Sequence, residues 1–207
     1  MIKNIVLDIG MVLGHFCWEK VYTDIMKING EDFDRLAKVT VLGPYWDEFD
    51  RGVFTDEEIA QKCIALSPDD EKLIREFYSH LGEIVEDYDY SYDWVKKLKT
   101  AGLKVYLLSN YGKTAFEKCR ANGNLKFVDL VDGDFISYRY KMIKPDPKIY
   151  ETFLKTYDLN GEECLFIDDR QVNVQAAIDA GINAYVFENY EKTVSYIEEA
   201  TGIKYND

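Results

Sequence analysis

Polar side chains that could carry out chemistry follow three apolar runs of this sequence. Asp8 ends the first run, Ser109 and Asn110 end the second, and Asp168 and Asp169 end the third. Each has an ordinary structural explanation, because Asp, Asn and Ser are common in turns and at helix starts. If the three runs were neighbouring strands of one parallel sheet, however, their ends would bring carboxylates, a hydroxyl and an amide to one place.

Three carboxylates at one edge of a sheet repel one another unless a cation lies between them. Oxygen ligands of this kind suit Mg²⁺, which binds one or two carboxylates together with waters and a substrate phosphate. Lys144 adds an ammonium group between the second and third runs, although a solvated loop lysine is the ordinary explanation for it. Together these residue types favour a site for Mg²⁺ and a phosphate group.

The elements around these side chains predict a parallel α/β sheet. Short apolar runs rich in β-branched residues are typical of buried parallel strands. We predict strands at residues 3–9, 103–108, 164–167 and 184–187, and a shorter one within 130–136. Helical spacing predicts helices at residues 92–100, 147–157 and 172–180. Alternating strands and helices favour a parallel sheet that is covered by helices on both faces.

Residues from about 14 to 87 break this alternation and predict helices throughout, with no strand. Thr55 and Glu58 have the spacing of a capping box, and Ser67 followed by Pro68 predicts another helix start. A helical segment inserted directly after the first strand is typical of a lid. The predicted architecture is therefore α/β, with a Rossmann-like core made of residues 1–14 and 88–207 and an inserted helical cap made of residues 15–87.

The composition argues against several classes of function. The chain has 207 residues, of which 47% are hydrophobic and 30% are charged, as expected for a globular protein. The net charge of −13, without a large Lys/Arg cluster, argues against a nucleic-acid partner, although a local cation can still make one pocket suitable for a small phosphorylated metabolite. No apolar run is long enough to span a membrane, and Asp8 interrupts the apolar stretch of the N-terminus, so we predict a cytoplasmic protein without a membrane partner. The four cysteines form no CxxC pair, so we expect no zinc site, and the oligomeric state is left open.

Four stretches occur in the order and spacing of known motifs: VLDIGMVL, VYLLSN, KP and FIDDRQVN. With them the chain resembles the haloacid dehalogenase-like hydrolase superfamily over nearly its whole length, including the helical cap after the first motif. The glycine two residues after Asp8, Gly10, and the pair Asp168 and Asp169 make the motifs similar to those of the subgroup that includes sugar-1-phosphate phosphatases. Gly52 fits the cap pattern of that subgroup.

The resemblance implies a Mg²⁺-dependent phosphatase in which Asp8 attacks phosphorus and forms an aspartyl-phosphate that water then hydrolyses. It implies that Mg²⁺ is bound by Asp8, by the backbone carbonyl of Gly10 and by Asp169. Asp168 would be a supporting or water-mediated ligand, and Asn173 takes the second position of the fourth motif.

The same resemblance implies how the phosphoryl group is held. Ser109 and the backbone at Asn110 would hydrogen-bond its oxygens, and Lys144 would neutralise the phosphate and the nucleophile together. The substrate surface is expected near the two ends of the cap, at Phe16, Trp18, Tyr45 and Trp46. Aromatic faces there suit a sugar ring, and they suit packing within the cap equally well.

Gly10 departs from the family pattern, because most phosphatases of the superfamily carry a second aspartate at this position. That aspartate protonates the leaving oxygen and then activates water, and such acid–base help contributes roughly 10²–10⁴-fold to the rate. Met11 is also unusual beside the nucleophile. One interpretation is a phosphatase that favours better leaving groups, such as sugar 1-phosphates, with His15 as a partial substitute for the missing group.

Two other interpretations stay open at this stage. A 2-haloacid dehalogenase needs neither the second aspartate nor a metal, but the carboxylates Asp168 and Asp169 then have no purpose. A non-catalytic protein could bind a phosphorylated ligand or a partner, but it would be expected to lose some of Asp8, Ser109 and Lys144.

Overall fold

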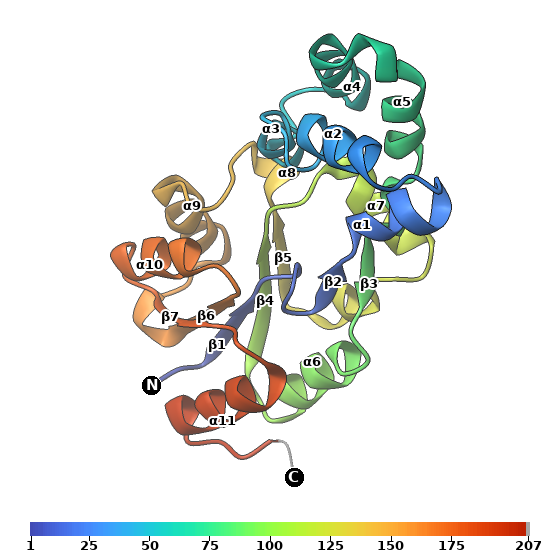
Figure 1. The fold of residues 1–207 in the computed structure, drawn as a ribbon. Coiled ribbons are helices and arrows are strands. Elements are labelled where there is room, and N and C mark those ends of the chain that lie inside the picture. The colour runs from blue at the N-terminus through green and yellow to red at the C-terminus, as the bar shows by residue number, and fades with distance from the viewer. Residues whose placement is uncertain (206–207) are drawn as a thin grey trace.

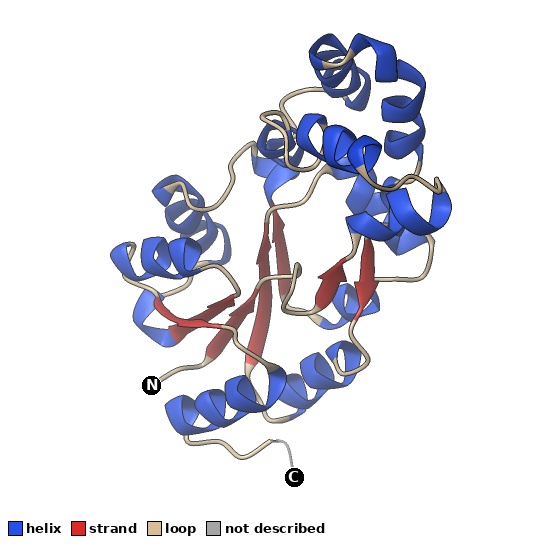
Figure 2. Cartoon of the chain, in the orientation of Figure 1, coloured by secondary structure: helices blue, strands red, loops and turns tan. Residues whose placement is uncertain are grey.

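A parallel five-stranded sheet forms the centre of the molecule, shown in Figures 1 and 2. The structure is a computed structural model, and it describes residues 1–205. The strands lie in the order β5-β4-β1-β6-β7. Their bounds are Asn4–Leu7 (β1), Lys104–Ser109 (β4), Gly133–Ile136 (β5), Cys164–Asp168 (β6) and Asn183–Val186 (β7). Leu7 lies opposite Leu107 on one side and Ile167 on the other, so the carboxyl ends of β1, β4 and β6 stand side by side.

Side chains of the central strands alternate between two hydrophobic clusters, as the period of a strand requires. Ile5 and Leu7 point to the face that α6, α7 and α11 cover, whereas Val6 points to the face that α9 and α10 cover. Every residue of β1 is buried, because both faces of the sheet are packed. The bounds of these helices are Ser91–Thr100 (α6), Lys113–Ala121 (α7), Pro147–Tyr157 (α9), Gln171–Asp179 (α10) and Tyr190–Thr201 (α11).

The prediction of a Rossmann-like parallel sheet is confirmed. The four longer predicted strands lie within two residues of the observed bounds, and the predicted helix at 147–157 has the observed bounds. Helices α7 and α11 and the short helix α8 (Ser137–Tyr140) are additional to the predicted ones. Among residues 1–205, no helix combines the length and the apolar character that crossing a membrane requires.

The helical insertion comprises the helices between residues 18 and 79, and it lies beyond the carboxyl end of the sheet (Figure 1). Its aromatic side chains form a core of their own, in which Tyr22 stacks on Phe77 with ring centres 4.8 Å apart. The predicted capping box at Thr55 and Glu58 is present. The helices are Trp18–Lys20 (α1), Glu31–Val39 (α2), Trp46–Arg51 (α3), Asp56–Leu66 (α4) and Glu71–Ser79 (α5).

The prediction that residues 14–87 contain no strand is wrong. Strands Gly14–Phe16 (β2) and Val85–Asp87 (β3) pair in antiparallel fashion and join the two ends of the helical insertion, with His15 opposite Glu86. Strands of three residues are too short to show an alternating pattern, so no local signal predicts them. The domain bounds 1–14 plus 88–207 and 15–87 stay a prediction, and Asn206 and Asp207 at the end of the predicted core lie outside the described residues.

Candidate active site

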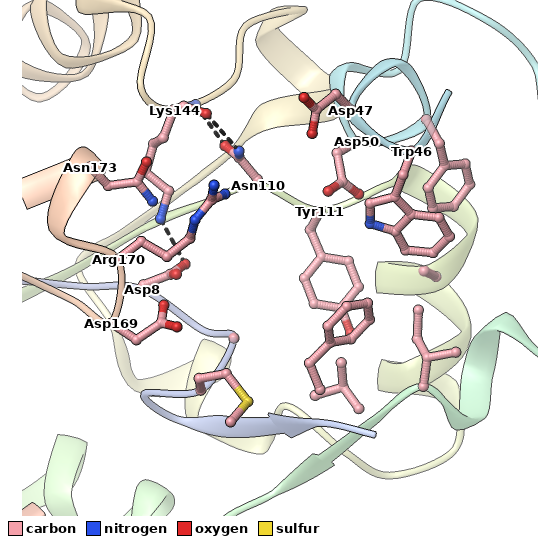
Figure 3. A pocket seen from close by; sticks show the side chains of 17 residues that line it. Asp8, Trp46, Asp47, Asp50, Asn110, Tyr111, Lys144, Asp169, Arg170 and Asn173 are labelled. Atoms are coloured by element: carbon pink, nitrogen blue, oxygen red, sulfur yellow. Dashed lines mark hydrogen bonds and ion pairs between the residues drawn. The ribbon is translucent and has the colours of Figure 1, made fainter. Parts of the chain in front are cut away.

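A cavity of about 220 Å³ lies between the carboxyl ends of the central strands and the helical insertion (Figure 3). Two groups of residues face each other across it. The core wall comes from the ends of the strands, the loops that follow the strands and α8, and the start of helix α10, and it consists of Asp8, Gly10, Asn110, Lys144, Asp169 and Asn173. The cap wall comes from helix α3, and it consists of Trp46, Asp47, Phe49 and Asp50.

Asp8 is the first residue after β1, and its carboxylate is held from several sides. Its backbone N–H continues the ladder to β6 by donating to the Ile167 carbonyl at 2.9 Å, and its Oδ1 accepts the backbone N–H of Ile9 at 2.8 Å. Lys144 Nζ lies 2.9 Å from Oδ1, and buried Ser109 lies beside the same carboxylate, whose charged form its hydroxyl favours. Burial raises the pKa of Asp8 to about 7, whereas the charge of Lys144 opposes that shift.

Lys144 is buried, with 2% of its surface exposed, and its ammonium joins two carboxylates. Nζ lies 2.6 Å from Asp168 Oδ2 as well as 2.9 Å from Asp8 Oδ1. Burial alone would lower the pKa of Lys144, but Asp168 and Asp8 together raise it, so the side chain carries its charge at neutral pH. The Asn110 amide fixes the lysine backbone by accepting from its N–H at 2.8 Å and donating to its carbonyl at 3.0 Å.

Asp168 and Asp169 differ in what their carboxylates contact. Asp168 is fully buried, and its oxygens accept from Lys144, from the backbone N–H of Arg170 at 2.8 Å and from Asn173 Nδ2 at 3.0 and 3.1 Å. Asp169 is half-buried and lines the cavity, where Figure 3 shows its carboxylate beside Asp8. Burial and the neighbouring Asp168 raise the pKa of Asp169. Asp169 is therefore the carboxylate of this pair that faces a ligand in the cavity.

The donor set of the core wall fits a divalent cation. One ligand oxygen from each of Asp8, Asp168 and Asp169 lies within 4.8 Å of the others, and the single ammonium of Lys144 leaves their negative charge in excess. The side-chain oxygen of Asn173, on the cavity wall, is buried without a hydrogen-bond partner. A Mg²⁺ ion with its waters would balance the excess charge and give that oxygen a donor.

The cap wall is fixed to the core at the start of α7 and at α8. The Ser137 hydroxyl accepts the backbone N–H of Tyr111 at 2.8 Å and donates to the backbone carbonyl of Asp50 at 2.6 Å. The Phe49 ring packs directly on Gly112, where an added Cβ would lie 2.2 Å from Cε1 of that ring. Glycine at position 112 thus allows the helical insertion to approach the core this closely.

The structure brings most of the predicted site residues together. Seven of them lie in or directly behind the core wall, and Trp46 lies in the cap wall beside Phe16, with ring centres 5.9 Å apart. The seven are Asp8, Gly10, Ser109, Asn110, Lys144, Asp168 and Asp169.

Three predicted residues do not line the cavity. Trp18 is buried in the core of the helical insertion, where it stacks on Phe33 at 5.6 Å. Tyr45 packs outside the cavity, with the Lys62 ammonium 5.4 Å from its ring centre. Their positions in the sequence did not predict their orientation, because the tertiary packing of the helices decides it.

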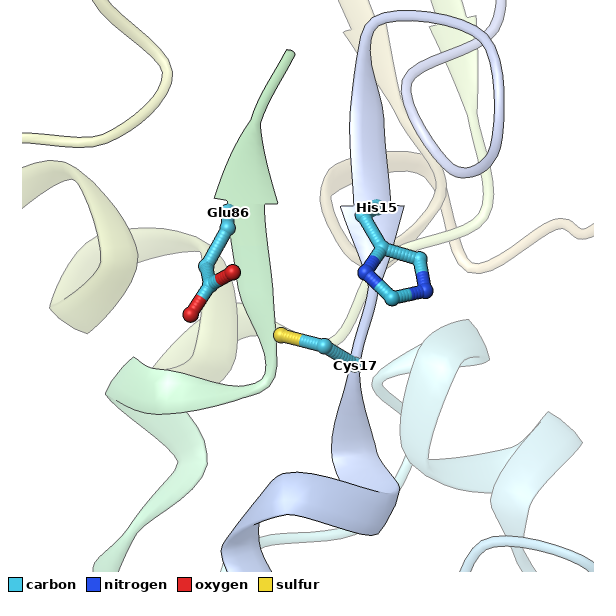
Figure 4. Close-up of side chains that lie close together, drawn as sticks. All are labelled: His15, Cys17 and Glu86. Atoms are coloured by element: carbon cyan, nitrogen blue, oxygen red, sulfur yellow. The ribbon is translucent and has the colours of Figure 1, made fainter.

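His15 also lies outside the cavity. It is on β2 next to Phe16, which lines the cavity, so the alternation of a strand turns His15 to the opposite side. There it stacks on Tyr88 at 6.3 Å and lies near Cys17 and Glu86 (Figure 4).

Both neighbours of His15 have other partners. The Cys17 thiol, whose pKa burial raises to about 11, contacts the Glu83 carbonyl, and Glu86 pairs with Lys20. The prediction that His15 substitutes for the missing aspartate is therefore not supported by its position.

Asp47 and Asp50 are cavity residues that the sequence analysis missed. They are three positions apart, a spacing that places two side chains on one face of a helix. That spacing, beside Trp46, was the available signal for this wall of the cavity.

Comparisons with known proteins agree with this architecture. The family model described as haloacid dehalogenase-like hydrolase matches residues 14–181. A sesquiterpene phosphatase of Aspergillus oryzae is 27% identical over 182 residues, which cover 87% of each chain. A D-ribitol-5-phosphate phosphatase of Bacteroides thetaiotaomicron is 26% identical and aligns with 91% of this chain and 93% of its own. In fold, the chain is similar to the crystal structure of a Bacteroides thetaiotaomicron enzyme of this family in complex with magnesium and inorganic phosphate, with a TM-score of 0.74, 23% identity, and coverage of 93% of this chain and 99% of that one.

Proposed function

Since the chain belongs to the haloacid dehalogenase-like hydrolase family and is a phosphatase of that family, we propose that it hydrolyses a small phosphomonoester with Mg²⁺, through an aspartyl-phosphate on Asp8. The observation that carries the proposal is the arrangement of Asp8, Lys144 and Asp169 around one cavity. It supplies a nucleophile, a fixed cation and a free carboxylate ligand at the point where a phosphoryl group would enter.

The chain's own residues position the first step. An Asp8 oxygen attacks phosphorus, the bond from phosphorus to the leaving oxygen breaks, and the phosphoryl group is transferred to Asp8. Two anions meet in this step, and the Lys144 ammonium, 2.9 Å from Asp8, lowers the repulsion between them. The hydroxyl of buried Ser109, beside Asp8, is the group that we assign to donate to a phosphoryl oxygen.

Mg²⁺ would be held by Asp8, the Gly10 carbonyl and Asp169, and when bound it supplies charge neutralisation and polarisation of the phosphoryl group. Asp168 has a different role in this proposal. Its carboxylate is occupied by Lys144, Arg170 and Asn173, so it positions the lysine rather than binding the metal directly.

The cap wall supports a sugar or polyol phosphate as the substrate. Trp46 and Phe49 offer aromatic faces, and Asp47 and Asp50 offer acceptors for hydroxyl groups. The D-ribitol-5-phosphate phosphatase named above acts on a phosphorylated polyol, as its name states. We place the reaction in the cytoplasm, because all four cysteines are free, buried thiols.

The test is phosphate release from a panel of sugar and polyol phosphates and from p-nitrophenyl phosphate, with Mg²⁺ or with EDTA. The proposal expects release that needs Mg²⁺ and that Asp8→Asn abolishes. Comparing sugar 1-phosphates with 6-phosphates tests whether a better leaving group compensates for Gly10, and equal rates would reject that preference. No release from the aryl phosphate would favour a phospho-ligand-binding protein, and halide release from a 2-haloacid would favour a dehalogenase.

A further inference from the structure

The proposed reaction leaves one role unfilled, which is proton transfer to the leaving oxygen and from the attacking water. Gly10 has no side chain to fill it, and a Cβ added there would meet no atom within 4 Å, so the space beside Asp8 is open. The cavity lining offers groups that could take the role from another direction.

Resting on the proposed phosphatase reaction, we propose that Asp50 of the helical insertion is the general acid and base of this site. Asp50 lines the cavity from α3, and Figure 3 shows its carboxyl group pointing into the open space across from Asp8. A substrate bound on Asp8 by its phosphoryl group would extend its leaving oxygen and carbon skeleton towards this wall.

Asp50 is held in place through its backbone and through the neighbouring Phe49 side chain. The Ser137 hydroxyl donates to the Asp50 backbone carbonyl at 2.6 Å, and the Phe49 ring packs directly on Gly112. Both partners belong to the core, so the position of this insertion residue relative to Asp8 is fixed. A group that transfers protons requires such a fixed position, because catalysis depends on hydrogen-bond reach.

The surroundings of Asp50 keep it protonated near neutral pH. Burial, followed by the charge of Asp47, raises its pKa to about 8, and the N–H of Gly112 opposes the shift. The charged and titratable groups that line the cavity with it are Asp47 on α3, Asp8 after β1, Tyr111 after β4, Lys144 after α8, and Asp169 and Arg170 after β6. A carboxyl that is neutral at this pH can donate a proton and can later accept one.

Asp50 loses a proton in the first step and regains one in the second. As the bond from phosphorus to the leaving oxygen breaks, that oxygen takes the electron pair of the bond and the proton of Asp50, and the alcohol departs. Water then attacks the phosphorus of the aspartyl-phosphate, and its proton passes to the Asp50 carboxylate. The bond from phosphorus to Asp8 breaks, which releases inorganic phosphate and restores both side chains.

The other titratable side chains near the cavity are less suited to this proton transfer. The Lys144 ammonium is bound by Asp8 and Asp168, and His15 faces away from the cavity. The Tyr111 hydroxyl donates to Cys119 Sγ, and burial keeps its pKa well above 10. Asp47 lines the cavity but is exposed to solvent.

The deciding experiment compares two leaving groups in the wild type and in Asp50→Asn. One substrate is an alkyl phosphate such as D-ribitol 5-phosphate, whose alkoxide needs a proton, and the other is p-nitrophenyl phosphate, whose phenolate does not. We expect kcat/KM for the alkyl phosphate to fall by about 10²-fold or more, and kcat/KM for the aryl phosphate to change by less than about threefold. The variant should also show a burst of one nitrophenolate per active site, because the second step lacks its base.

Three further arms separate proton transfer from a structural role. Gly10→Asp in the Asp50→Asn background should restore turnover of the alkyl phosphate, since the open space at Gly10 accepts a new carboxyl group. In the wild type, kcat/KM for the alkyl phosphate should fall as the pH rises through the pKa of Asp50, about 8, and Asp50→Asn should remove this alkaline limb. Asp47→Asn, the matched charge change on the same helix, should shift the limb to lower pH, because it removes a negative neighbour.

Equal losses of kcat/KM for both substrates in Asp50→Asn, or no loss for either, would overturn this inference while leaving the phosphatase proposal intact. A wild-type protein that cleaves neither substrate would instead overturn the proposed function, and the inference with it.

Discussion

The two walls of the cavity are built in opposite ways. In the core wall, charged groups from different strand ends hold one another, as Lys144 does with Asp8 and Asp168. In the cap wall, all the groups come from the single helix α3. This helix contributes the carboxyl groups of Asp47 and Asp50 to the lining of the described cavity, but no cationic side chain. Under the proposed function the two walls have different roles: the core wall binds and attacks the phosphoryl group, and the cap wall contacts the rest of the substrate and contributes Asp50 for proton transfer.

The physical basis of this division is the sheet register. The ends of β1, β4 and β6 are level because their strands pair residue by residue, so a shift of any one of them would break a ladder of hydrogen bonds. The cap wall is placed by packing of the insertion on the core, including the contacts of α3 with Gly112 and Ser137. We therefore expect core-wall substitutions to affect all substrates alike and cap-wall substitutions to affect them selectively.

The largest effect is expected for Asp8→Asn, which removes the nucleophile and leaves the shape of the side chain nearly unchanged. We expect phosphate release to fall on the order of 10³-fold or more for every substrate, because no other group reaches phosphorus. Steady-state phosphate release across the panel measures this. Thermal unfolding of the variant is the control, and selective loss for one substrate alone would contradict the assigned division.

Lys144→Met should have the next largest effect, and it should lower both activity and stability. Without the ammonium, Asp8 and Asp168 are buried without their partner, so we expect a loss of about 3–5 kcal/mol in the free energy of unfolding. We also expect a fall of about 10²–10³-fold in kcat for all substrates.

The stabilising contribution of Lys144 depends on pH with a definite sign. Because folding raises its pKa, this contribution is fully present below the ordinary value of 10.5 and is lost as the pH rises through the folded pKa. Chemical denaturation of the wild type and of Lys144→Met at several pH values measures their free energies of unfolding. The difference between these two free energies should become smaller at alkaline pH. A difference that widens there would contradict the ion-pair assignment.

Asp169→Asn and Asp168→Asn form a matched pair that tests the two roles within the core wall. Asp169→Asn should raise the Mg²⁺ concentration for half-maximal activity by about 10–100-fold, because the cavity-facing ligand is weakened. Asp168→Asn should lower kcat with a much smaller change in the Mg²⁺ requirement, because it disturbs Lys144 instead. Mg²⁺ titrations of both variants decide this, and the reverse pattern would exchange the two assignments.

The smallest effect is expected for Gly112→Ala, which acts on the cap wall alone. The new methyl group would lie 2.2 Å from the Phe49 ring, so the ring and helix α3 must move away from the core. We expect a loss of about 1–3 kcal/mol in stability and a rise in KM that differs between substrates. Lys113→Ala, at the exposed next residue, is the control for helix α7. A uniform fall in kcat for all substrates would contradict the prediction, because it would show that Gly112 affects the core wall as well.

The core wall could be predicted from the sequence because its residues occupy the ends of recognisable strands. A short apolar run that stops at Asp8, Ser109 or Asp168 specifies both a buried strand and the position of its last side chain. The strand pattern does not distinguish the roles of Asp168 and Asp169, and only the resemblance to the family favours Asp169 as the metal ligand and Asp168 as a supporting one.

The cap wall could not be predicted to the same extent. Strands β2 and β3 pair His15 with Glu86, 71 positions apart in the sequence (86 minus 15), so no local pattern reveals them. Because β2 was not predicted, strand alternation could not be used to predict that His15 points away from the cavity and Phe16 points towards it. Trp18 and Trp46 are both aromatic residues of the helical insertion, and only the packing of its helices distinguishes the buried one from the cavity residue.

The antiparallel pairing of β2 with β3 has a consequence for how proteins of this design diversify. Gly14 lies opposite Asp87, so the chain leaves and re-enters the core at adjacent points whatever lies between them. The entropy of closing the intervening segment grows only slowly with its length. The insertion can thus be exchanged without moving Asp8, Lys144 and Asp169, but a grafted insertion would have to supply its own acid–base group in place of Asp50.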